Sequence, residues 1–240
     1  MAEQIGLSLP VQSSEGIDEF YISDCNTMAV NLLEDWKNWP NLKHILSGPP
    51  ASGKTHLGRI WAKQVNATYT NARDLQIINI DKIATTALVI DNVSEMSADK
   101  DLEGSLFHLH NLLQERKLPF LLIGTGSPQF WKISLSDLRS RIEGTRNAQI
   151  GELDDKLFPL IMAKLFADRQ MYPSPDVFEY LSRRIDRSFL SINSIVTEID
   201  RVSIEEKRPI TRPLVLSLIH ISEPTRPERI GDGGVGVEKK

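Results

Sequence analysis

The stretch GPPASGKT, residues 48–55, decides the fold of this chain. It matches the P-loop pattern, in which a glycine-rich loop joins a strand to a helix and cradles phosphate groups. Gly48 and Gly53 let the backbone curl so that successive N–H groups point inward and bind phosphate oxygens. Lys54 is expected to reach the outer phosphates, and the Thr55 hydroxyl is expected to bind Mg²⁺. The stretch therefore predicts a nucleotide site.

The residues on either side of the loop favour the same interpretation. The short apolar run KHILS, residues 43–47, predicts a strand directly before the loop. After the loop, Leu57, Trp61 and Val65 mark one face of a helix, whose positive dipole end would point at the phosphates. The predicted nucleotide-binding residues are Gly48, Pro49, Pro50, Ala51, Ser52, Gly53, Lys54, Thr55, His56, Asp91 and Thr125.

A second part of such a site is an acid at the end of a buried strand. The run ALVIDN, residues 87–92, supplies Asp91, which is placed to hold Mg²⁺ through water. Asp91 is a predicted catalytic residue, and Asp91 and Thr55 are the predicted metal-binding residues. Its neighbour Asn92 cannot act as a base for an attacking water. Glu95 could substitute, although the sequence does not place it. The chain therefore favours nucleotide binding over turnover, and we expect weak or no ATPase activity by itself.

The order of the elements predicts an α/β fold. Further strands are predicted at residues 67–71, 85–92 and 119–126, the last two as apolar runs, with helical patterns between them. Strands that alternate with helices form a parallel sheet wrapped by helices. Three helical patterns without a strand follow between residues 152 and 215 and predict a small helical domain. We expect the nucleotide-binding domain to span residues 19–151.

The two ends do not follow these patterns. Residues 1–18 have little periodicity and form an expected tail. Residues 216–240 end in a glycine-rich run, and they resemble either the translation of sequencing-adapter read-through or a natural disordered tail, so they are excluded from the predicted fold.

The bulk composition limits the classes of function. The net charge is −4, and a protein that binds nucleic acid independently usually has a basic face and a high pI. A single cysteine excludes a disulfide framework and fits a reducing cytosol. No stretch has the length and apolar content of a transmembrane helix. We therefore expect a cytoplasmic protein that contacts DNA only indirectly.

Several motifs in one order resemble a known family. A P-loop, then LVIDN (88–92), LLIGTGSP (121–128), DLRSRI (137–142) and a helical lid follow one another. This order resembles AAA+ proteins of the DnaA type, and within them the Hda-like members. The resemblance covers about residues 1–215. It implies an AAA+ nucleotide-binding core followed by a helical lid.

The resemblance also implies roles for residues near the nucleotide. GTGSP looks like the sensor-1 segment, with Thr125 or Ser127 near the γ-phosphate. Arg141 matches the arginine finger, a catalytic guanidinium that reaches the nucleotide of a neighbouring subunit. Arg139 and Arg141 could equally be solvated helix charges. Leu190 stands where the lid usually carries an arginine, which favours ADP as the resting ligand.

For function, Hda-like proteins imply a negative regulator of replication initiation. Its partners would be the initiator DnaA, whose ATP hydrolysis it stimulates, and the DNA polymerase sliding clamp, which brings it to the replisome and the nucleoid. Homo-oligomers are also possible. The start QIGLSLP, residues 4–10, is similar to clamp-binding peptides, in which Gln4 would form hydrogen bonds and Leu7 and Leu9 would fill an apolar pocket.

Two alternatives share the same P-loop core. One is an autonomous ATPase of the helicase-loader type, against which Asn92 and the acidic pI count. The other is a non-catalytic clamp adaptor in which the nucleotide only stabilises the fold.

Overall fold

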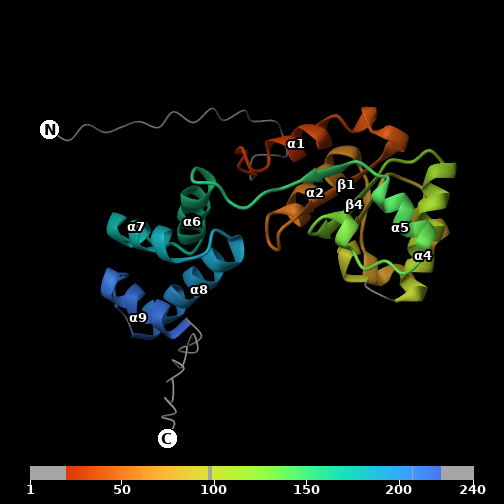
Figure 1. Ribbon diagram of the computed structural model, residues 1–240. Coiled ribbons are helices and arrows are strands. Elements are labelled where there is room, and N and C mark those ends of the chain that lie inside the picture. The colour runs from red at the N-terminus through yellow and green to blue at the C-terminus, as the bar shows by residue number, and fades with distance from the viewer. Residues whose placement is uncertain (1–19, 97–98, 207, 223–240) are drawn as a thin grey trace, which may run out of the picture. The chain divides into compact units, whose positions relative to one another are not determined.

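The structure, a computed structural model, describes residues 20–96, 99–206 and 208–222 (Figure 1). The chain divides into two compact units. The core unit comprises the described residues up to Ile161, together with Asp186–Ile192. The lid unit comprises Met162–Ile185 and the described residues from Asn193 onward.

The core unit is built on one parallel sheet, as the alternating pattern predicts. Its strand order is β2-β3-β4-β1-β5, and each strand pair is parallel. β4 therefore lies between the strand that precedes the P-loop and the strand that ends in Asp91. The strands are β1 (Lys43–Gly48), β2 (Thr68–Asn71), β3 (Leu88–Asp91), β4 (Phe120–Thr125) and β5 (Asn147–Gln149). The last is three residues long, too short for its pattern to be found in the sequence.

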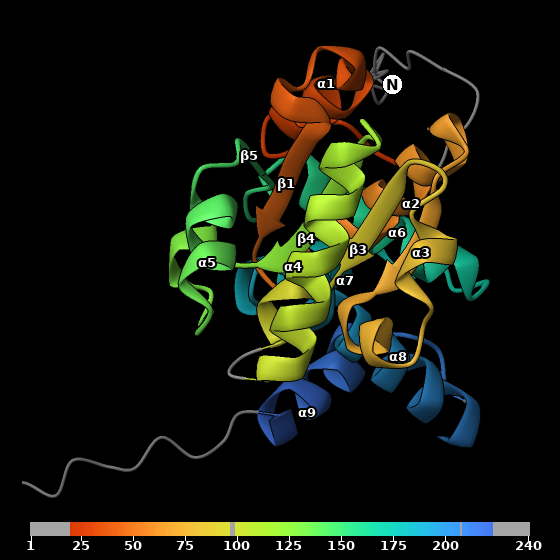
Figure 2. The ribbon, with the colours of Figure 1, turned by 90° about the vertical axis from the view of Figure 1, so that its right-hand side faces the viewer.

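Helices cover both faces of this sheet. Figure 2 shows α4 lying across β4 and β3. The helices of this part of the chain are α1 (Thr27–Glu34), α2 (Lys54–Val65), α3 (Ile80–Ile83), α4 (Lys100–Glu115) and α5 (Ser136–Glu143). Short 3₁₀ turns connect them: η1 (Trp36–Asn38), η2 (Pro40–Leu42), η3 (Ala72–Gln76), η4 (Val93–Met96) and η5 (Pro128–Phe130).

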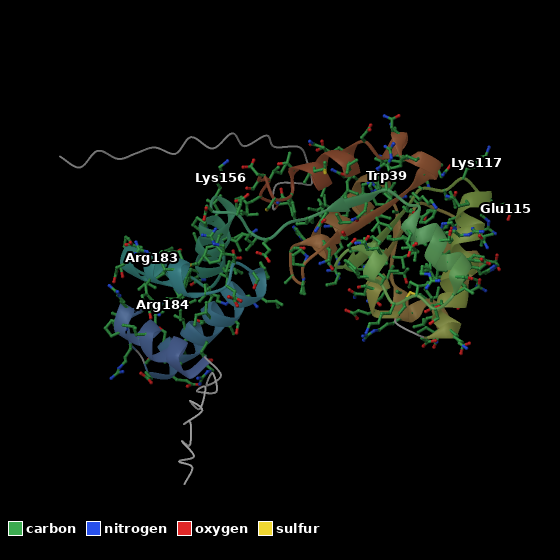
Figure 3. All side chains as sticks on the ribbon, viewed as in Figure 1. Trp39, Glu115, Lys117, Lys156, Arg183 and Arg184 are labelled. Carbon is green, nitrogen blue, oxygen red and sulfur yellow. The ribbon has the colours of Figure 1, made fainter. Side chains whose placement is uncertain are left out.

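Alternate residues of β1, β3 and β4 enter two separate hydrophobic clusters. Ile45 packs with the leucines of α4, whereas its neighbour Leu46 packs with residues of α1 and α2. Trp39, labelled in Figure 3, joins the second cluster and stacks on Trp61 with ring centroids 5.0 Å apart. Strands with both faces covered need continuous apolar sequence, which explains the unbroken apolar runs.

The final part of the chain contains helices α6 (Leu157–Asp168), α7 (Pro175–Arg184), α8 (Phe189–Glu206) and α9 (Arg212–Ser222). The sequence pattern predicted three helices here, and the structure has a fourth. α9 includes residues 216–222, which the sequence analysis assigned to the tail. Leu214, Val215 and Leu218 are all buried, and this apolar face fixes α9 within the lid unit. In the described residues, no helix has the length and apolar character needed to cross a membrane.

Candidate functional site

The P-loop connects β1 to α2 with little free space. A Cβ atom on Gly48 would lie 2.5 Å from the carbonyl oxygen of Ile150, so only glycine fits there. Gly53 precedes the first turn of α2 with φ of 90°, in the left-handed region that favours glycine. Both glycines of the motif therefore have a steric reason in this chain. Gly48 allows the close approach of Ile150, and Gly53 allows the backbone turn before α2.

Lys54 lies inside the loop with 7% of its surface exposed. Its Nζ donates hydrogen bonds to the carbonyl oxygen of Pro49 and to Oγ of Ser52, the second at 3.4 Å. Burial lowers the pKa of Lys54, while the charge of Asp91 acts in the opposite direction. A buried ammonium that bonds only neutral oxygens gains from a phosphate partner. The loop therefore fits a phosphorylated ligand.

The structure brings Thr55 and Asp91 into direct contact. The Thr55 hydroxyl donates a 2.7 Å hydrogen bond to Oδ2 of Asp91, and the Asn92 N–H donates to Oδ1 at 2.7 Å. Asp91 is 3% exposed. A hydroxyl and a carboxylate are oxygen donors of the kind Mg²⁺ takes in nucleotide sites, often through water. This donor set fits Mg²⁺ beside the P-loop lysine.

Tyr69 of β2 is a third residue at this carboxylate, and the sequence analysis did not single it out. Its hydroxyl donates to Oδ2 of Asp91. Burial, and then the hydrogen bond and charge of Asp91, raise the pKa of Tyr69, so the hydroxyl remains a donor. The strand pattern of residues 67–71 contains this tyrosine, but only the pairing of β2 with β3 brings it to Asp91.

The segment predicted to be sensor 1, residues 124–128, lies beside the P-loop. Thr125 ends β4 directly opposite Gly48 of β1, and the Gly126 N–H donates to the Gly48 carbonyl at 3.0 Å. The backbone of Thr125 is held from two sides, by Oγ of Ser94 at 2.8 Å and by the Trp131 indole N–H at 3.0 Å. The side chain of Thr125 is exposed at this edge, whereas Ser127 is half-buried at the start of η5.

An aromatic pair lies at the start of α2. Phe20 stacks on His56 with ring centroids 5.8 Å apart and planes 24° apart. The N-terminal segment that carries Phe20 is fixed to residues after β5, because Ser23 and the Cys25 N–H donate to Oδ2 of Asp154. Lys156, labelled in Figure 3, pairs with Asp24 at 3.0 Å. Phe20 lies just inside the predicted nucleotide-binding domain, which begins at residue 19, but it was not among the predicted site residues.

Arg141 of α5 is bound to α4 of its own unit. Its Nη1 donates to Oδ1 of Asn111 and lies 3.3 Å from Nδ1 of His110. Its Cζ lies 4.7 Å from the ring centroid of Phe107. Arg139, by contrast, is exposed. The geometry thus leaves Arg139 in solvent and holds Arg141 by three residues of one helix face.

His110 lies between two cations. Its Nε2 is 3.4 Å from Nζ of Lys43, and its Nδ1 faces Arg141. Burial, followed by the charges of Lys43 and Arg141, lowers the pKa of His110 to about 4. The ring is therefore neutral at ordinary pH, which allows one nitrogen to accept a hydrogen bond from a neighbouring cation.

Two further residues weighed in the sequence, Glu95 and Leu190, are exposed to solvent, and the predicted clamp-binding residues are not among those that the structure describes. Glu95 is exposed and pairs with Arg73 at 2.9 Å. Leu190 is 56% exposed. Gln4, Leu7 and Leu9 lie outside the described residues.

Comparison with known proteins finds a family model for the lid segment and solved structures that share the fold. Residues 162–219 match the family model described as "Hda, lid domain". Domain III of the DnaA replication initiation protein from Thermotoga maritima superimposes with a TM-score of 0.73 at 15% identity, over 85% of this chain and 95% of that one. The lid segment of this chain is therefore similar to that of Hda, and the chain has a fold like that of DnaA domain III.

Other solved structures share the fold of this chain. AMPPCP-bound DnaA from Aquifex aeolicus matches with a TM-score of 0.64 and 20% identity, over 79% of this chain and 66% of that chain. A RuvB protein from Thermotoga maritima matches with a TM-score of 0.64 and 22% identity, over 85% and 71%. At these identities the likeness concerns the fold, and this chain spans about two thirds of these two proteins.

Proposed function

We propose that this Hda-like protein binds a nucleotide, with ADP as its resting ligand, and regulates replication initiation by stimulating ATP hydrolysis on the initiator DnaA. The observation that carries the proposal is a match to the Hda lid domain at residues 162–219 in a chain whose P-loop holds a buried lysine that donates hydrogen bonds to neutral oxygens. The lid relates the chain to DnaA regulators, and the loop supplies the nucleotide site.

In this proposal the loop amides and Lys54 bind the phosphates of the nucleotide. Thr55 and Asp91 hold Mg²⁺, directly or through water, and the metal neutralises phosphate charge when it is bound. Thr125, opposite Gly48, lies at the same edge of the sheet and is the preferred sensor-1 residue. Phe20 and His56 flank the first turn of α2 on the side of the N-terminal segment.

The same site is poorly equipped to activate water. The residue after Asp91 is an asparagine that donates its N–H to the carboxylate. The carboxylate of Glu95 is engaged by Arg73. Leu190 offers no cation to a γ-phosphate. These three features support a protein that retains its nucleotide and does not hydrolyse it rapidly.

Arg141 is the proposed arginine finger for the nucleotide of a DnaA subunit. Its present partners, Asn111, His110 and the Phe107 ring, are neutral. A charged guanidinium exchanges neutral partners for phosphate oxygens with a gain in electrostatic energy when the partner excludes water. We further propose that residues 4–10 bind the sliding clamp and thereby deliver Arg141 to DnaA at the replisome.

Hydrolysis of ATP on DnaA, measured with clamp-loaded DNA, tests the proposal. The wild-type chain should show little hydrolysis alone and should accelerate DnaA. Arg141→Ala should reduce that acceleration by at least about 10³-fold, or to background. The matched change Arg139→Ala on the same helix should leave it intact. Full stimulation by Arg141→Ala would refute the finger assignment, and rapid hydrolysis by the chain alone would favour a helicase-loader type ATPase.

A further inference from the structure

The hydrogen bonds around Asp91 assign a role to Tyr69. We propose that Tyr69 is a positioning residue that limits how strongly Asp91 binds a divalent cation, so that the nucleotide is retained with little help from the metal. The inference rests on the proposed nucleotide site. It concerns how much of the affinity for ADP comes from protein groups and how much depends on Mg²⁺.

The carboxylate of Asp91 can accept only a limited number of hydrogen bonds. An ionised carboxylate offers about four lone-pair positions. In Asp91, Oδ2 accepts from both Thr55 and Tyr69, and Oδ1 accepts from the Asn92 N–H. Three of the four positions are therefore used by the protein. Waters in the shell of a bound cation must share the remaining position or displace one of these donors.

The position of Tyr69 follows from the sheet and is not a chance contact. β2 pairs in parallel with β3, and this pairing sets Tyr69 opposite Val89, two residues before Asp91. Residues two apart on a strand point to the same face, so Tyr69 and Asp91 both face α2. From α2, Arg59 places its guanidinium carbon 5.3 Å from the centroid of the Tyr69 ring, which holds the ring between helix and sheet.

A donor on the carboxylate also reduces the charge that it presents to a cation. Thr55 is needed by the metal itself and can donate while it coordinates. The Tyr69 hydroxyl reaches Asp91 from the neighbouring strand and also interacts with Arg59 of α2, and the proposal gives it no place among the metal ligands. Removing this hydroxyl therefore restores an acceptor site without removing a ligand.

The test compares Tyr69→Phe with wild type by titrating a fluorescent ADP analogue in EDTA and over a range of MgCl₂ concentrations. The Mg²⁺ concentration that gives half of the metal-dependent gain in ADP affinity should fall by about tenfold, as expected for loss of one charge-assisted hydrogen bond. The affinity in EDTA should stay within about twofold of wild type. Tyr172→Phe, on an exposed tyrosine of the lid unit, is the matched control and should change neither value.

Two outcomes overturn the inference: an unchanged or weaker response to Mg²⁺ in Tyr69→Phe, or an equal change in affinity with and without metal. A melting temperature in EDTA without nucleotide checks folding. The same substitution in an Asp91→Asn background gives a double-mutant cycle, and there the hydroxyl should have no effect on the Mg²⁺ response. If wild type binds no ADP in either buffer, the proposed nucleotide function itself fails, and this result is distinct from the others.

Discussion

Oγ1 of Thr55 lies 2.7 Å from Oδ2 of Asp91, although the two residues are 36 positions apart and belong to a helix and to a strand that is not next to the strand before that helix. Thr55 is in the first turn of α2, and Asp91 ends β3. Because β4 separates β1 from β3 in the sheet, the contact is made by the helix that leaves the P-loop. This pair defines where a metal would bind beside Lys54.

Replacing Lys54 tests the phosphate site. Lys54→Ala should lower ADP affinity by about 100-fold, since charge-assisted hydrogen bonds to phosphate are lost. Without nucleotide the melting temperature should stay the same or rise, because a buried ammonium without an anionic partner is costly. Lys63→Ala, at an exposed position of the same helix, is the control and should bind normally. ADP at 100 times its Kd should stabilise wild type by about 2.7 kcal/mol and Lys54→Ala by much less.

Gly124→Ala tests how closely β4 approaches Trp131. A Cβ at this position would lie 2.3 Å from Cζ2 of Trp131, whose indole N–H also holds the Thr125 carbonyl. Overpacking against a rigid ring should lower the free energy of unfolding by about 1–3 kcal/mol, measured by urea denaturation. Gly104→Ala, in the middle of α4 with no atom within 4 Å of the new Cβ, should instead stabilise by up to about 1 kcal/mol. Equal effects of the two changes would contradict the packing described here.

His110 predicts a pH dependence of stability. Its pKa is lowered to about 4 in the folded protein by burial and by Lys43 and Arg141, against about 6.5 when unfolded. The unfolded chain therefore binds a proton that the native state resists. The contribution of His110 to stability is complete above about pH 6.5 and is lost as the pH falls towards 4.

Urea denaturation at several pH values measures this effect. Between pH 7 and 5, wild type should lose about 1–2 kcal/mol through His110, and His110→Gln should show a correspondingly flatter dependence. The exposed His108→Gln, two residues away, should keep the wild-type slope. If His110→Gln left the pH dependence of the free energy of unfolding unchanged, the buried ring would not be the cause of the loss of stability in acid.

The proposed clamp-binding peptide is tested by capture on immobilised sliding clamp. Changing Gln4, Leu7 and Leu9 to Ala should abolish capture, because a few anchors supply most of the binding energy in such peptides. The nucleotide affinity of this variant should be that of wild type. Retention of full clamp binding would place the interaction elsewhere on the chain.

Local sequence determined the parts of this protein that depend on neighbouring residues. The P-loop spacing, the apolar runs of β1, β3 and β4, and the helical periods are properties of short segments. They were sufficient to predict the α/β core with its parallel sheet and a helical domain after it. They could not reveal β5, which is three residues long, or the apolar face of α9 within a segment that resembled a tail.

The tertiary structure alone decided which distant groups meet. The position of β4 between β1 and β3 depends on the packing of the whole sheet. Each strand can pair along both of its edges, and the sequence of a single strand does not determine which strands pair with it. The pairing of β2 with β3 brings Tyr69 to Asp91, and the pairing of β4 with β1 brings Thr125 to Gly48. Packing of α5 on α4 likewise decided that Arg141 rests on Phe107, His110 and Asn111 while Arg139 faces solvent. Sequence determined the chemistry of each group, and long-range packing determined its partners.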